Sequence, residues 1–212
     1  METLDRGFKS WAERTAATLR RELKVAPLAP IDPLRTAALL GIEVCTPRDV
    51  PGLPDDVANA LLDGDPYGWS AVSLAIKDGG LVIYNPRKSK GRRASDIMHE
   101  LAHFLLDHTP STIILSEDLD VAIRSFDAKQ EDEANWLAWA VLLPRDALVA
   151  CLRRRMSKEA IAEQYGVSEK LVVFRTGITG AAYQVRGRAP AWLTRRRHLE
   201  ADALKHRQKK VT

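Results

Sequence analysis

Ile97-Met98-His99-Glu100-Leu101-Ala102-His103-Phe104-Leu105-Leu106 is an apolar stretch that carries two histidines four residues apart. Residues four apart lie on one face of an α-helix, so both imidazoles would point the same way. The apolar neighbours predict a buried helix from about Ser95 to His108. Histidines on a buried face need partners, and a metal ion can supply one. The alternative is a pair of core histidines hydrogen-bonded to backbone or carboxylate groups.

The H-E-x-x-H spacing of this stretch is typical of zinc peptidases. Two ring nitrogens can bind one zinc ion at about 2.0–2.1 Å, and zinc lowers the pKa of its bound water to about 7. A neighbouring carboxylate can take the proton of that water and later pass it to a leaving amine. The spacing therefore predicts His99 and His103 as metal ligands and Glu100 as the catalytic base.

A third ligand has to come from downstream, because the metzincin pattern of glycine and histidine does not follow His103. The downstream acids are Asp107, Asp118, Asp120, Asp127, Glu131, Asp132 and Glu133. A helix expected over 130–143 places Glu131 and Asn135 on the face that carries Ala134. We predict Glu131 as the ligand, Glu133 as the second choice, and Asn135 as a group that steadies a ligating histidine. The alternative is that these acids simply form the charged first turn of a helix.

The pattern around these motifs predicts an α+β protein, with a small, mostly antiparallel sheet packed on helices. Strands are expected over 42–45, 70–76 and 81–84, and helices over 8–23, 33–40, 55–62, 95–108, 130–143, 145–154, 158–165 and 169–174. Residues 77–80 have hairpin chemistry, residues 87–93 are expected as a solvated basic loop, and the glycines from Gly177 on as a loose segment. We predict a zincin-like domain over 1–144, a helical, helix-turn-helix-like subdomain over 145–183 and a basic, flexible tail over 184–212.

Composition is that of a globular protein, with 45% hydrophobic and 28% charged residues among 212. No 18 apolar residues run together, and the first residues lack the apolar stretch of a secretory signal, so neither a membrane span nor export is predicted. The two cysteines, Cys45 and Cys151, are expected as free thiols of a cytoplasmic protein. Residues 195–212 carry +5 and the remainder −1, which together give the net charge of +4. A near-neutral body does not favour a large nucleic-acid-binding face.

The segment Ile161-Ala-Glu-Gln-Tyr-Gly-Val-Ser168 has helix-turn-helix spacing. A DNA-reading helix should offer polar groups near its start, but residues 171–174 are all apolar. We therefore expect this second helix to pack against the body, with a docking surface or DNA reading as the alternatives.

Four motifs together resemble the ImmA/IrrE family of metallo-endopeptidases. They are Leu81-Val-Ile-Tyr-Asn85, His99-Glu-Leu-Ala-His103, Glu131-x-x-Ala134-Asn135-x-x-Ala138 ending in Leu142-Leu-Pro144, and Ile161-Ala-x-x-Tyr-Gly-Val-Ser168. The resemblance extends to about residue 183. Leu137 stands where the family typically has Phe, and Leu143 where it often has Met; both are mild apolar changes.

This resemblance implies a bacterial or phage protease in which His99, His103 and a gluzincin-like Glu131 bind the metal and Glu100 is the base. The family metal is usually Zn²⁺, with Mn²⁺ as an alternative. Members often cleave a helix-turn-helix repressor encoded beside them, which switches on a mobile element or a stress response. The expected partner is therefore a protein substrate, while nucleic acid is not favoured and no membrane is expected.

Two questions stay open at the level of sequence. The oxyanion formed during peptide hydrolysis needs a donor besides the metal, and the candidates are Tyr84, Arg92, His108 and Tyr165. Two other functions also stay open: a DNA-binding regulator with a structural metal, and an interaction module whose metal site is catalytically silent.

Overall fold

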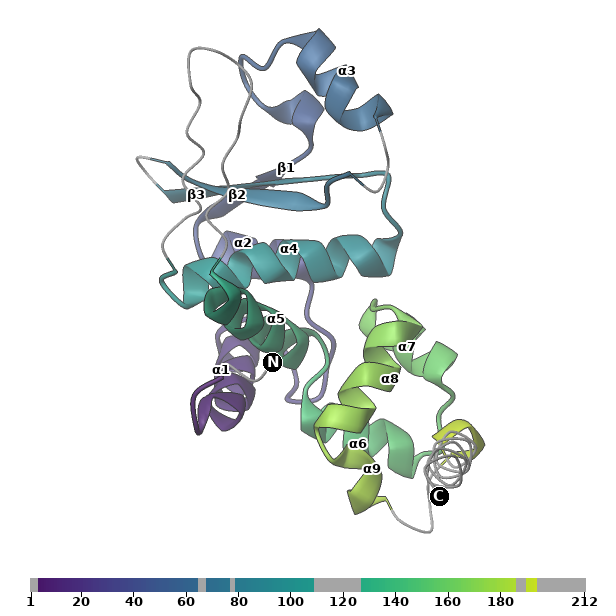
Figure 1. Cartoon of the computed structure of the whole chain (residues 1–212). Helices are drawn as coiled ribbons and strands as arrows, with labels where there is room; N and C mark the ends of the chain where they lie inside the picture. Colours follow the sequence, from purple (N-terminus) through teal and green to yellow (C-terminus); the bar gives the residue numbers. More distant parts are fainter. Residues whose placement is uncertain (1–3, 65–67, 77–78, 109–126, 186–189, 194–212) are drawn as a thin grey trace, which may run out of the picture.

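The computed structural model describes residues 4–64, 68–76, 79–108, 127–185 and 190–193. In chain order its elements are α1 (Phe8–Glu22), α2 (Pro33–Leu39), β1 (Ile42–Cys45), the 3₁₀ helix η1 (Pro47–Asp49), α3 (Asp55–Asp63), β2 (Ala71–Ile76), β3 (Gly79–Tyr84), α4 (Lys90–Leu105), α5 (Ala128–Leu142), α6 (Arg145–Arg153), α7 (Lys158–Tyr165), α8 (Glu169–Ile178) and α9 (Ala181–Gln184). The predicted α+β class is confirmed (Figure 1).

The sheet has three strands in the order β1-β3-β2. β2 and β3 form the expected antiparallel pair, but β1 pairs with β3 in parallel, so the sheet is mixed. Parallel strands need a crossover connection, and η1, α3 and β2 supply the chain between β1 and β3. Gly80 of β3 faces α4, and a Cβ atom there would lie 2.6 Å from the Phe104 ring. The glycine therefore allows the helix to pack close under the sheet.

The layers follow one another from the sheet to α4 and then to α5 and α1 (Figure 1). α5 is the central helix, and its buried residues are Ala134, Trp136, Leu137, Ala138, Ala140, Val141 and Leu142. A helix that is apolar nearly all round belongs inside a core. Only its first turns, which carry the acids, reach the edge of that core beneath α4.

α4 begins five residues earlier than predicted, so residues 90–93 are helical and the expected solvated loop is wrong there. The turn before the helix is closed by the Asn85 side chain, which accepts a hydrogen bond from the backbone N–H of Arg87 (3.0 Å). Gly91 in the first helical turn touches the backbone of the turn between α7 and α8. This long-range contact packs Gly91 against the turn, while the neighbouring Arg92 side chain stays 60% exposed.

The helices α6 to α9 form the piece that was expected to resemble a helix-turn-helix. Gly166, at φ 63°, ends α7, and the Ser168 side chain caps α8 by accepting from the N–H of Leu171. Leu171 and Val172 are buried. The loose segment expected from Gly177 is wrong, because α8 continues to Ile178 and α9 follows. The boundary at residue 144 stays a prediction, and most of the predicted tail lies outside the described residues.

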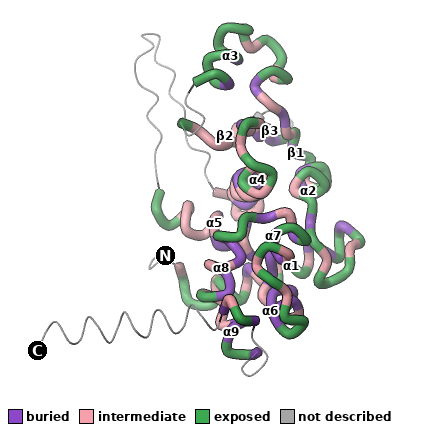
Figure 2. The backbone as a smooth tube through the Cα atoms, turned by 90° about the vertical axis from the view of Figure 1, so that its right-hand side faces the viewer, coloured by how far each residue is buried: buried purple, intermediate pink, exposed green. Residues whose placement is uncertain are grey.

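Buried residues form one cluster that runs from the sheet through α4 and α5 to α1 and the helices α6 to α9 (Figure 2). Two arginines lie inside it. Arg20 donates to the carbonyl of Val141 (2.8 Å), and Arg175 donates to the carbonyl of Leu143 (3.1 Å). They satisfy carbonyl groups at the C-terminal end of α5 that have no partner within the helix. Of the described helices, none is long and apolar enough alone to span a membrane; α5 and α6, bent by 45°, pass that test only as a pair.

Gly91→Ala is expected to lower the free energy of unfolding by about 1–2 kcal/mol. Alanine favours a helix by about 0.5–1 kcal/mol, but the added Cβ would lie 2.7 Å from the Val167 carbonyl carbon, and overpacking costs about 1–3 kcal/mol. The matched control is Gly177→Ala in α8, where nothing lies within 4 Å of the added atom. Urea unfolding should show destabilisation for the first variant and slight stabilisation for the second. Equal effects would contradict the contact.

Candidate metal centre

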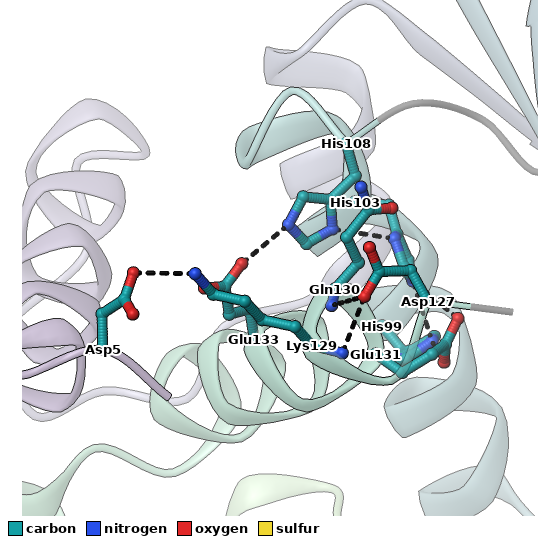
Figure 3. Close-up of polar contacts among 9 residues, drawn as sticks. All are labelled: Asp5, His99, His103, His108, Asp127, Lys129, Gln130, Glu131 and Glu133. Atoms are coloured by element: carbon teal, nitrogen blue, oxygen red, sulfur yellow. Dashed lines mark hydrogen bonds and ion pairs between the residues drawn. The ribbon is translucent and has the colours of Figure 1, made fainter. Parts of the chain in front are cut away.

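Three predicted ligands meet where α4 crosses the start of α5 (Figure 3). His99 Nε2 lies 3.1 Å from His103 Nε2 and 3.2 Å from a Glu131 oxygen, and the second Glu131 oxygen lies 3.6 Å from His103 Nε2. The Asp127 side chain caps α5 by accepting from the N–H groups of Lys129 and Gln130. Because α5 begins at Ala128, directly after this cap, Glu131 lies in its first turn, where it faces the two histidines.

The spacing of these atoms matches what a zinc-type ion requires. Ligands placed tetrahedrally at about 2.0–2.1 Å from one ion lie about 3.3 Å from one another. The two histidine nitrogens lie 3.1 Å apart, and one Glu131 oxygen lies 3.2 Å from His99 Nε2, both close to that value; the other Glu131 oxygen lies 3.6 Å from His103 Nε2. Two imidazoles and one carboxylate also form a donor set typical of catalytic zinc sites, which keep a fourth position open. The residues present therefore fit a divalent transition-metal ion.

The protonation of His99 depends on this cluster. Burial lowers the pKa of His99, but its hydrogen bond to Glu131 and the charges of Glu100 and Glu131 outweigh burial and raise that pKa overall. Asn135 lies beside His99, and its hydrogen bond adds to the rise of this pKa. A metal ion must displace the proton that these acids favour, so metal binding weakens toward acidic pH.

Glu100 lies beside the ligands and is only 4% exposed. The hydroxyl of Ser73 in β2 donates to one of its carboxylate oxygens at 2.6 Å. Ser73 is a residue that the sequence analysis missed. The alternation of β2 could have indicated that it faces the same layer as Ala71, but only the packing of β2 on α4 shows what it meets.

The metal centre opens into a cavity of about 430 Å³. Another cavity, of about 450 Å³, lies away from the metal centre, between α1 and the α5–α6 junction. Besides His99, Glu131 and Glu100, the cavity at the metal centre is lined by Trp69, Ser70, Arg92, Asp96, Asn135 and Trp139. Burial raises the pKa of Asp96, although the Arg92 side chain pairs with it at 2.8 Å. This cavity, the cleft of the metal centre, thus has two tryptophan side chains and the Arg92–Asp96 ion pair in its walls.

Of the remaining candidates, only Arg92 lines this cavity among the described residues. Tyr84, another candidate oxyanion donor, is absent from the lining. The Tyr165 hydroxyl donates to the carbonyl of Leu28 (2.7 Å). His108 contacts His103 and Glu133. Glu133, the second choice as ligand, therefore faces His108 rather than the three ligating atoms. Asp118 and Asp120 lie outside the described residues.

A comparison with protein families identifies the chain. The model of the IrrE N-terminal-like domain, a peptidase family, matches residues 57–176, more than half of the chain. The chain belongs to this family. The assignment confirms the resemblance to ImmA/IrrE proteins and supports a metal-dependent, peptidase-like function. The matched region includes Glu100 and all three residues of the metal centre, as well as α7 and most of α8.

Other comparisons add little to this family assignment. No curated protein matches the sequence. A solved structure named as a Mycobacterium tuberculosis transcriptional regulator is similar, with 20% identity and a TM-score of 0.49. The match covers 78% of this chain and 46% of that one, so the chain spans less than half the length of that regulator.

Adding Zn²⁺ to the metal-free protein is expected to raise its thermal unfolding midpoint. At a free Zn²⁺ concentration one hundred times the Kd, binding to the folded state alone contributes about 2.7 kcal/mol. The raised pKa of His99 stabilises the metal-free fold at acidic pH, and this stabilisation is lost as the pH rises through that pKa. The Zn²⁺-induced shift should therefore shrink toward acidic pH. Differential scanning fluorimetry at several pH values checks this, and an equal shift in Glu131→Ala would contradict the site.

Proposed function

We propose that this protein is a metal-dependent endopeptidase that hydrolyses a peptide bond in a protein substrate. The observation that carries the proposal is the convergence of His99, His103 and Glu131 beside a buried Glu100 at the wall of an open cleft. Membership of the IrrE N-terminal-like family supports the same chemistry. Zn²⁺ is the expected metal and Mn²⁺ the alternative.

In this mechanism His99, His103 and Glu131 hold the cation, which when bound supplies Lewis-acid polarisation of the scissile carbonyl and of water. Glu100 accepts the proton of the attacking water and delivers it to the amine that leaves. Ser73 already donates to one Glu100 oxygen, so the other oxygen stays available for the water. Arg92 lies in the cleft and is our candidate donor to the oxyanion.

For the substrate, we propose a helix-turn-helix repressor encoded near this protein, as the family resemblance implies. The test is co-expression with the products of neighbouring reading frames, followed by mass mapping of any fragment. The wild-type chain should cut one partner at a defined bond, and a chelator should prevent the cut. Intact partners throughout, with metal bound, would favour a catalytically silent interaction module.

Direct DNA binding is the other outcome that this experiment has to separate. The start of α8, where a DNA-reading helix contacts bases, lies against the first turn of α4 at Gly91. A duplex would therefore have to approach α8 from its exposed side, which carries Glu169 and Lys170. Salt-dependent binding to duplex DNA that persists in Glu100→Gln, with no partner cut, would favour the DNA-binding function instead.

A further inference from the structure

His103 has a hydrogen-bonded support on the side of its ring that faces away from the other ligands (Figure 3). Its Nε2 faces His99 and Glu131, whereas its Nδ1 lies 3.0 Å from Nδ1 of His108. The far nitrogen of His108, Nε2, lies 3.2 Å from a Glu133 oxygen. Three side chains thus form one line, from the carboxylate through both imidazoles to the metal centre.

The backbone after α4 is built to bring His108 to this position. α4 ends at Leu105 with Leu106 as its cap, and Asp107 takes the left-handed conformation with φ 52°. The N–H of His108 donates to the carbonyl of His103 (3.0 Å), and the N–H of Asp107 donates to that of Phe104 (3.1 Å). This pair of bonds is the Schellman ending of a helix, in which the residues equivalent to His103 and His108 touch each other. That contact is usually apolar, whereas here it joins two imidazoles.

Burial indicates that the contact is not incidental. The His108 and Glu133 side chains are only 7% and 14% exposed, so water does not readily replace either partner. Toward solvent, Glu133 also faces Lys129 at 3.9 Å, and Lys129 pairs with Asp5 at 2.9 Å.

The order of partners determines which nitrogen carries each hydrogen. Nε2 of His108 faces a carboxylate, which only accepts, so the hydrogen of a neutral His108 lies on Nε2. Its Nδ1 is then an acceptor and requires a hydrogen on Nδ1 of His103. The lone pair of His103 Nε2 is thereby directed toward His99 and Glu131, as a metal ligand requires.

We propose that His108 is the positioning residue that fixes the tautomer and ring orientation of His103 for metal binding, and that Glu133 orients His108 in turn. The proposal rests on the metal site proposed above. Groups that support metal-ligating histidines typically change metal affinity by about 10–100-fold. In most such sites a carboxylate or carbonyl contacts the ligand directly, whereas here a second histidine lies between them.

The first test is the Zn²⁺ affinity of the full chain, measured by competition with a chromophoric chelator. His108→Phe keeps a ring but removes the acceptor, and it should bind Zn²⁺ about 10–100-fold more weakly than the wild type. His108→Asn keeps an acceptor oxygen near the position of Nδ1 and should recover part of the loss. The matched control is Asp107→Gly, which suits the left-handed turn and should keep wild-type affinity.

A second measurement needs no substitution, so it holds even if His108→Phe fails to fold. In the ¹⁵N-labelled, Zn²⁺-loaded wild type, the hydrogen of His108 should lie on Nε2, and a scalar coupling should connect the two Nδ1 nuclei across their hydrogen bond. A hydrogen on Nδ1 of His108, or unchanged affinity in a folded His108→Phe, would overturn the proposal. Failure of the wild type to bind Zn²⁺ would instead overturn the metal site itself.

Discussion

Glu100→Gln is expected to lower the rate of substrate cleavage by about 10²–10⁴-fold while metal binding persists. The amide keeps the size of the side chain and can still accept from Ser73, but it cannot take a proton from water. Positioned general acid–base groups typically contribute rate factors of this size. Single-turnover cleavage of the co-expressed partner, quantified by mass spectrometry, measures the loss, and metal content measured on the same sample shows whether the ligands are intact.

The control for this prediction is Ser73→Ala. Removing the hydroxyl leaves Glu100 able to accept a proton, but without a partner that fixes one oxygen. We expect cleavage to fall by less than in Glu100→Gln, with the same metal content. If Glu100→Gln cut the partner at the wild-type rate, Glu100 would not be the base, and the cleft would need another carboxylate for that role.

Glu13→Ala is expected to lower the free energy of unfolding by about 3 kcal/mol. The Arg175 side chain has no exposed surface, and its charge is paired with Glu13 at 2.6 Å. Burial lowers the pKa of Arg175, and the charge and hydrogen bond of Glu13 oppose that shift. Removing one partner of a buried pair costs about 3–5 kcal/mol, and Glu13 is 26% exposed, which places the effect at the lower end.

The Glu13 carboxylate also accepts from the backbone N–H of Arg145 at 3.0 Å. Removing this carboxylate therefore also removes a hydrogen bond between α1 and the first residue of α6. Urea unfolding followed by circular dichroism measures the change in midpoint at constant slope. Glu22→Ala is the matched control, since Glu22 is exposed at the end of the same helix, and it should shift stability by less than about 0.5 kcal/mol. Equal midpoints for the two variants would contradict the buried pair.

Local spacing in the sequence is sufficient to predict those features of this protein that lie within one helix or one hairpin. The two histidines share a face because residues four apart always do so on a helix, and the apolar pattern of residues 130–143 indicated a buried helix. The same periodicity favoured Glu131 over Glu133, and the structure brings Glu131 to both histidines. Hairpin chemistry likewise predicted the antiparallel pairing of β2 with β3.

Contacts between segments that are far apart in the sequence could not be predicted from local spacing. Ser73 meets Glu100 across 27 positions, and Glu133 meets His108 across 25, so neither pair leaves a trace in local spacing. Gly91 in the first turn of α4 likewise fits closely against the turn after α7, which is far away in the sequence. Helix geometry decides which residues share a face, because backbone hydrogen bonds repeat at a constant interval. The neighbour opposite that face depends on how whole elements pack, and packing is a property of side chains far apart in the chain.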